Sequence, residues 1–114
     1  MTKMYERRVA KGAALLDEKK PDWWNGKDKQ TINLKTLDLE SPCRCILGQT
    51  YPASGEYFPS GYNTGVRKLD LTRKATIEHG FTVETAGSEM LHFGILRRRW
   101  HELITRRRKA ARRR

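Results

Sequence analysis

Apolar residues recur at helical spacing in two long stretches of the chain. The first stretch predicts a helix over residues 3–19, ended by Pro21, because the residue before a proline avoids helical geometry. Its apolar stripe consists of Tyr5, Val9, Gly12, Ala13 and Leu16. The second stretch predicts the longest helix, capped by Ser88 and fraying after Lys109. Its stripe consists of Met90, Phe93, Leu96, Trp100, Leu103 and Ile104.

A shorter helix is predicted between Ser41 and Tyr51. Ser41 suits the N-cap and Pro42 the first helical position, and the helix must end before Pro52. Its core face would carry Cys43, Ile46, Leu47 and Thr50, which leaves Cys45 at the edge of the core.

A fourth helix is predicted to end at His79. Asp70 or Thr72 suits its N-cap, and Gly80 suits the left-handed position that follows many helices. Phe81 would then fold back on the last turn.

The remaining segments are less regular. Residues 27–40 fit either two short extended pieces or an irregular crossing segment. Residues 52–65 form a predicted loop, rich in Gly and Pro, that is longer than most loops of compact domains. Its aromatic residues either form a contact surface or pin the loop to the body; they are Tyr57, Phe58 and Tyr62.

Two adjacent tryptophans, Trp23 and Trp24, precede an Asn-Gly turn. Such a pair can offer a stacking platform for nucleic-acid bases. We favour the interpretation that both rings complete a small core, because tryptophan buries a large apolar area.

These patterns predict a mainly α protein: one small domain of about four helices, short extended or irregular segments and a basic C-terminal helix. The chain has 114 residues, which suits a single domain. No apolar run has the length of a membrane span, and the first 16 residues lack the apolar core of a secretory signal. Two cysteines separated by one residue cannot form the disulfide framework of a secreted protein, so we expect a reducing, cytosolic location.

The formal net charge of +11 is concentrated at the C-terminus. Residues 97–114 hold ten of the 24 basic residues and one acid, Glu102. We therefore divide the chain into a compact helical domain, residues 1–105, and a basic arm, residues 106–114. An arginine-rich block of this kind is typical of nucleic-acid binding, although it also suits a solvated tail.

No group of residues predicts catalysis, a cofactor or a metal. Cys43 and Cys45 have one intervening residue, whereas structural zinc sites use two to four and a second pair of ligands. Three histidines are the other possible ligands, namely His79, His92 and His101. There is no Gly-rich phosphate loop and no paired carboxylates, so we expect a protein that is not an enzyme.

Several blocks resemble a small uncharacterised protein family of actinobacteriophages and actinobacteria. They are Gly12-Ala13-Ala14-Leu15-Leu16-Asp17, Trp23-Trp24 and Cys43-Arg44-Cys45-Ile46-Leu47-Gly48-Gln49. The resemblance implies a phage or actinobacterial origin and a location in the cytoplasm of the bacterial host, and it supplies no catalytic residues. It draws attention to Gly48, where we expect close packing, and to Gln49, which we expect to bond a neighbouring backbone group.

The sequence thus predicts a non-enzymatic protein that binds DNA or RNA through phosphate contacts. The predicted contacts are Arg97, Arg98, Arg99, Arg106, Arg107, Arg108, Lys109, Arg112, Arg113 and Arg114. The alternative is a protein-interaction module that modulates a bacterial host complex through Tyr57, Phe58 and Tyr62. Attachment to a membrane surface ranks below both, because the apolar stripe of the last helix is needed for the core.

Overall fold

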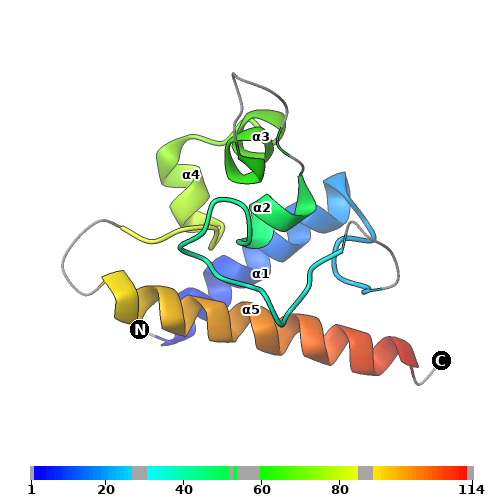
Figure 1. The fold of residues 1–114 in the computed structure, drawn as a ribbon. Helices are drawn as coiled ribbons and strands as arrows, with labels where there is room; N and C mark the ends of the chain where they lie inside the picture. Colours follow the sequence, from blue (N-terminus) through cyan, green and yellow to red (C-terminus); the bar gives the residue numbers. More distant parts are fainter. Residues whose placement is uncertain (1, 27–30, 52, 54–59, 85–88, 113–114) are drawn as a thin grey trace.

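The structure is a computed structural model, and the part of the chain that it describes contains five helices joined by irregular segments (Figure 1). The described residues are 2–26, 31–51, 53, 60–84 and 89–112. The helices are α1 (Thr2–Lys19), α2 (Ile46–Thr50), α3 (Gly61–Lys68), α4 (Arg73–Glu78) and α5 (Glu89–Arg112). None of these residues lies in a β-strand, so the predicted mainly α class is confirmed, with one helix more than predicted.

The core centres on Trp100, where α5 packs against α1. Trp100 is fully buried, stacks on Phe81 at 5.7 Å between ring centroids and meets Trp23 edge-on, also at 5.7 Å. Its indole Nε1 donates to the carbonyl of Gly80 at 2.6 Å. Gly12 makes this contact possible, since a Cβ there would lie 2.9 Å from the Trp100 ring and 2.1 Å from the His79 carbonyl oxygen. The two predicted apolar stripes therefore meet at one crossing point.

The turn after α4 follows the sequence prediction closely. Thr72 Oγ1 accepts from the Ala75 amide at 3.1 Å and caps the helix. Gly80 has φ +70°, and the amides of Gly80 and Phe81 bond the carbonyls of Ile77 and Thr76. This pair of bonds is the Schellman C-cap. It turns the chain so that Phe81 enters the core, as predicted.

The start of α2 differs from the prediction. Ser41 Oγ accepts from the amides of Cys43 and Arg44, but this closes a separate turn and does not begin the helix. The helix begins at Ile46 and its N-cap is Cys45, whose Sγ accepts from the Gly48 amide at 3.2 Å. As a result the two cysteines exchange their predicted places: Cys43 is exposed and Cys45 is buried.

Helix α3 begins within the residues predicted as a loop and continues beyond them. Ser60 caps it by accepting from the Asn63 amide at 3.2 Å. Gly61, which suggested a loop, is instead needed for packing against α2, since a Cβ there would lie 2.4 Å from the Gly48 carbonyl oxygen. The expected close packing at Gly48 is thus confirmed, and the loop prediction for residues 61–65 is wrong. Tyr57 and Phe58 lie outside the described residues.

The described part of the 27–40 segment is irregular and runs beside α5, from Ile32 near Arg108 to Leu37 near Arg97 (Figure 1). Gln49 holds it to α2: its amide nitrogen donates to the carbonyls of Asn33 and Arg44, at 3.2 and 2.8 Å. Its side-chain oxygen accepts from the Asn33 amide. The backbone-bonding role expected for Gln49 is confirmed, and Ile32, Leu37 and Leu39 are buried in the core.

Candidate nucleic-acid interface

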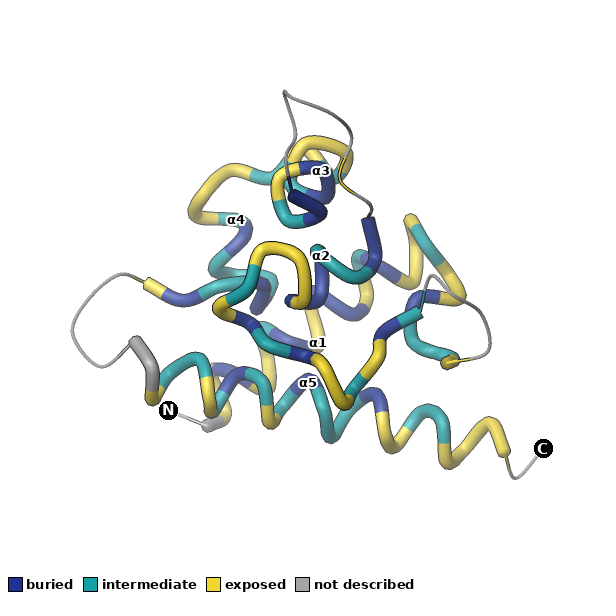
Figure 2. Tube along the Cα trace, in the orientation of Figure 1, coloured by how far each residue is buried: buried dark blue, intermediate teal, exposed yellow. Residues whose placement is uncertain are grey.

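Helix α5 presents its basic residues in two directions. Figure 2 shows buried and exposed residues alternating along its length. Four arginines contact the rest of the fold, namely Arg97, Arg99, Arg107 and Arg108. We call these the inward arginines. The other four described cations, here the outward cations, are Arg98, Arg106, Lys109 and Arg112, all exposed. Arg113 and Arg114 lie outside the described residues.

Two inward arginines lie in the middle of α5. Arg97 Nε donates to the carbonyl of Leu37 at 2.7 Å, which holds the described part of the 27–40 segment against the helix. Arg99 donates to Glu102 at 2.9 Å and reaches Glu6 of α1 at 3.4 Å, and its side chain is only 18% exposed. Both therefore act as links between elements that are distant in sequence.

Arg107 forms a two-pronged ion pair with Asp17 of α1, with N–O distances of 2.6 and 2.9 Å. The same carboxylate accepts from Trp23 Nε1 at 2.9 Å. The guanidinium also lies over both neighbouring indoles, 5.6 Å from the Trp23 centroid and 5.9 Å from that of Trp24. Burial alone would raise the pKa of Asp17, but the hydrogen bonds from Arg107 and Trp23 and the Arg107 charge outweigh it and lower that pKa.

Arg108 binds two backbone carbonyls. Its Nε donates to the Trp24 oxygen at 2.7 Å, and Nη2 donates to the Ile32 oxygen. Gly26, in a left-handed turn with φ +75°, gives the guanidinium room, since a Cβ there would lie 3.1 Å from its central carbon. Burial and the neighbouring charge of Arg112 lower the pKa of Arg108.

These contacts explain why α5 extends to Arg112 and does not fray after Lys109. The sequence prediction relied on apolar docking, which ends at Ile104. Arg107 and Arg108 dock the last turns by polar contacts instead. The proposed boundary between residues 105 and 106 is a boundary of charge, and the helix continues across it.

The outward cations lack the partners that occupy the inward arginines. Arg106, Lys109 and Arg112 form no ion pair with any residue that the structure describes. Arg98 has one loose contact, 3.7 Å to Glu102, and its side chain remains 75% exposed. At 100° per residue, Arg98, Lys109 and Arg112 project within about 60° of one another around the helix axis.

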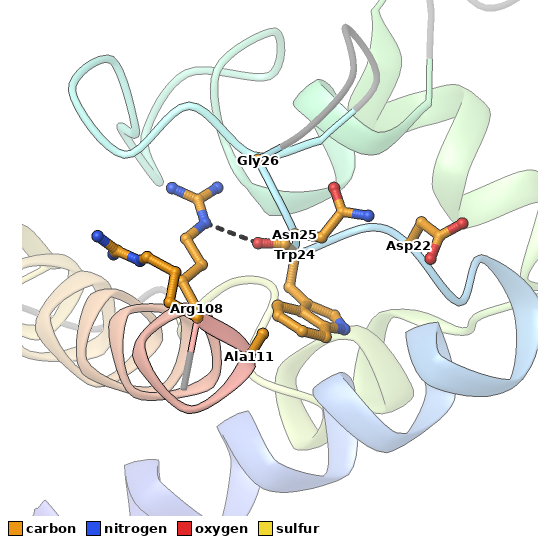
Figure 3. A pocket seen from close by; sticks show the side chains of 7 residues that line it. Asp22, Trp24, Asn25, Gly26, Arg108 and Ala111 are labelled. Atoms are coloured by element: carbon orange, nitrogen blue, oxygen red, sulfur yellow. Dashed lines mark hydrogen bonds between the residues drawn. The ribbon is translucent and has the colours of Figure 1, made fainter. Parts of the chain in front are cut away.

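A cleft of about 490 Å³ opens between the end of α5 and the turn that contains Trp24 and Gly26 (Figure 3). Its lining residues are Asp22, Trp24, Asn25, Gly26, Arg108, Ala111 and Arg112. Figure 3 shows the Trp24 indole beside Ala111, with Arg108 donating to the Trp24 carbonyl. The arrangement places an aromatic ring and two guanidinium groups around one opening.

The two adjacent tryptophans have different environments. Trp23 is 1% exposed and belongs to the core, which confirms the core interpretation for that ring. Trp24 is partly buried, packs against the core and also lines the cleft. Tyr62 packs inward as well: it is partly buried, and burial raises the pKa of its phenol. It therefore helps to pin α3 to the body, and the contact surface predicted with Tyr57 and Phe58 stays a prediction.

The cysteines and histidines occupy separate positions. Burial raises the pKa of the Cys45 thiol to about 11, partly offset by its bond from Gly48, so it is neutral at physiological pH. His79 stacks on Phe81, His92 bonds the Tyr5 hydroxyl at 2.6 Å and His101 bonds Thr105. Among the described residues, no three His, Cys, Asp or Glu side chains form a metal-binding group.

The internal partners of the arginines were not found by sequence reasoning. Asp17 lies 90 residues from Arg107, and Arg108 binds carbonyls that any residue type would offer. Helical periodicity relates residues only within one element, so it carries no signal for these contacts.

Within the described residues, no helix has both the length and the apolar character needed to cross a membrane. No family model, no curated protein and no solved structure matches the chain. The resemblance to the actinobacteriophage family therefore stays a prediction.

Proposed function

We propose that the protein binds nucleic acid, without catalysis, through the outward cations of α5. The observation that carries this proposal is the set of exposed cations on the solvent side of α5, of which Arg106, Lys109 and Arg112 have no acidic partner among the described residues. Unpaired cations at this density attract a polyanion, and phosphate contacts give affinity without reading sequence.

The packing of α5 argues against a membrane surface as the polyanion. A basic helix that lies on a bilayer needs an apolar face to insert. Leu96, Trp100 and Ile104 are each fully buried against the rest of the protein. The helix therefore offers its charge to a partner and keeps its apolar side for the core.

The test is a variant in which all four outward cations become glutamine, measured by fluorescence anisotropy with a labelled duplex and a labelled single strand. We expect the affinity at low salt to fall at least tenfold. The slope of log K against log salt should shrink by about 3 to 4 for a duplex, because four phosphate contacts are lost. Unfolding by urea should remain within about 0.5 kcal/mol of the wild type, as for other exposed sites.

A matched control removes four exposed cations from other elements, again by change to glutamine: Lys3, Arg44, Arg67 and Lys68. Both variants lower the net charge by the same amount. Equal loss of affinity in the two would mean that the total charge attracts nucleic acid and α5 has no special part. Unchanged affinity in the α5 variant would overturn the proposal.

Truncation after Thr105 is a poorer test of the same proposal. It would remove Arg106, Lys109 and Arg112, but also Arg107 and Arg108, which bind Asp17, Trp24 and Ile32. Loss of binding would then have two explanations, a lost surface or a loosened fold. Point substitutions of the outward cations separate them.

A further inference from the structure

The cleft beside Trp24 combines an aromatic ring with two arginines among its lining residues. A second hollow of about 480 Å³ lies next to it. Gly26 and Arg108 line both hollows. Each volume lies within the range of pockets that hold small organic groups.

Two guanidinium groups stand one helical turn apart at this cleft. Arg108 uses two of its N–H groups on the carbonyls of Trp24 and Ile32, which fixes its position and leaves other donors. Arg112 is exposed and close enough for its charge to disfavour the charged form of Arg108. A phosphate bound between two like charges would relieve their repulsion. Asp22 is the one acidic residue among those that line the cleft.

Trp24 adds an aromatic wall to this cationic pair. The other two tryptophans, Trp23 and Trp100, are 1% and 0% exposed, so they are closed to any ligand. Trp24 and Ala111 both line the cleft, and Figure 3 shows the small Ala111 side chain beside the Trp24 indole. An aromatic ring beside fixed cations suits a ligand that carries both a flat base and a phosphate.

We propose that this cleft holds one unpaired nucleotide of a single-stranded nucleic acid, with its base against Trp24 and its phosphate between Arg108 and Arg112. This inference rests on the proposed function, because the rest of the strand would follow the outward cations. Arg112 belongs to both surfaces and joins them. A base within a duplex is stacked and paired, and its extraction costs free energy, so the cleft should favour single strands.

The test compares a labelled twelve-nucleotide oligothymidylate with a labelled duplex of equal length. The variant Trp24→Leu keeps apolar packing but removes the aromatic wall, and Trp24→Phe keeps an aromatic ring. We expect Trp24→Leu to weaken binding of the oligothymidylate about tenfold and binding of the duplex less than twofold. Trp24→Phe should restore most of the lost affinity. Circular dichroism and urea unfolding would establish that each variant is folded.

A second measurement uses tryptophan fluorescence. Oligothymidylate should quench part of the wild-type emission, and the quenching should disappear in Trp24→Leu, which retains Trp23 and Trp100. Thymidine monophosphate should quench weakly, at much higher concentration than the oligonucleotide. Quenching by the mononucleotide with no binding of the oligonucleotide would overturn the inference in favour of a small-molecule site.

The remaining outcomes separate the two proposals. Equal weakening of single strand and duplex by Trp24→Leu, or no weakening of either, overturns the cleft as a nucleotide site. The proposed function survives either of these results if the variant lacking the four outward cations binds nucleic acid more weakly than the wild type. If the variant lacking the four outward cations binds as well as the wild type, the proposed function fails, and this inference fails with it.

Discussion

Arg106 and Arg107 are neighbours in the chain and have different environments. Arg107 joins α5 to α1 through Asp17 and covers two indoles, whereas Arg106 is exposed and has no acidic partner among the described residues. The same contrast separates Arg108 from Lys109 and Arg99 from Arg98. A basic run on one helix therefore serves two purposes, and the charge that faces a partner is smaller than the charge that the sequence contains.

The pair Arg108 and Lys109 should show the largest difference in stability. Arg108→Ala leaves the carbonyls of Trp24 and Ile32 without their donors, so we expect a loss of about 2 kcal/mol in the free energy of unfolding. Lys109→Ala should change it by less than about 0.5 kcal/mol. Urea unfolding followed by circular dichroism measures both. Similar losses in the two variants would remove the distinction between inward and outward residues.

The pair Arg107 and Arg106 should show a smaller difference. Arg107→Ala removes an ion pair whose side chains are 30% and 41% exposed, so solvent screening limits its contribution. With the two indole contacts included, we expect a loss of about 1 kcal/mol. Arg106→Ala serves as the control and should leave unfolding unchanged within error. If Arg107→Ala leaves the free energy of unfolding unchanged, the ion pair does not stabilise the fold, and other contacts determine how α5 packs on α1.

The Asp17 carboxyl gives the same comparison a pH dependence. Its pKa is lowered in the folded protein, so its contribution to stability is present above its unfolded pKa of about 3.9. That contribution is lost as the pH falls through the lower folded value. We expect wild-type stability to fall by more than that of Arg107→Ala as the pH is lowered below about 4. Parallel pH profiles would show that Asp17 titrates independently of Arg107.

The smallest effect is expected for Arg99 and Arg98. Arg99→Gln breaks contacts to Glu102 and Glu6 at a site that is 18% exposed, and should cost about 0.5 kcal/mol. Arg98→Gln should have no measurable effect on unfolding, but should weaken nucleic-acid binding. Arg99→Gln should leave binding nearly unchanged. Arg99→Gln should therefore affect unfolding only, and Arg98→Gln should affect binding only. Equal weakening of binding by both variants would contradict the distinction between inward arginines and outward cations.

Local rules predicted the parts of the fold that local geometry decides. Thr72, Gly80 and Phe81 follow capping preferences that depend on a few adjacent residues, and the structure has them as expected. The stripes on α1 and α5 also followed, because helical periodicity reports which face is buried. Trp23 was predicted to lie in the core because of its large apolar area, and it is buried there.

The sequence predictions failed or were incomplete where one side chain has an unusual role, or where the interacting residues are far apart in the sequence. A thiol is a weak hydrogen-bond acceptor, so nothing in the sequence favoured Cys45 over Ser41 as the cap of α2. Gly61 suggested a loop, although its role is close contact with Gly48. The internal partners of the inward arginines were missed because Asp17 and the Trp24 carbonyl become their neighbours only on folding.

Because α5 is one uninterrupted helix, it holds the outward cations at fixed distances from one another. From Arg98 to Arg112 the helix rises about 21 Å, at 1.5 Å per residue. Duplex DNA advances about 3.4 Å per base pair along one strand, so a duplex lying parallel to the helix would meet these end cations over about six base pairs. The inward arginines keep this distance constant by docking the last turns. A shorter duplex would leave one end of the row unused, whatever its sequence.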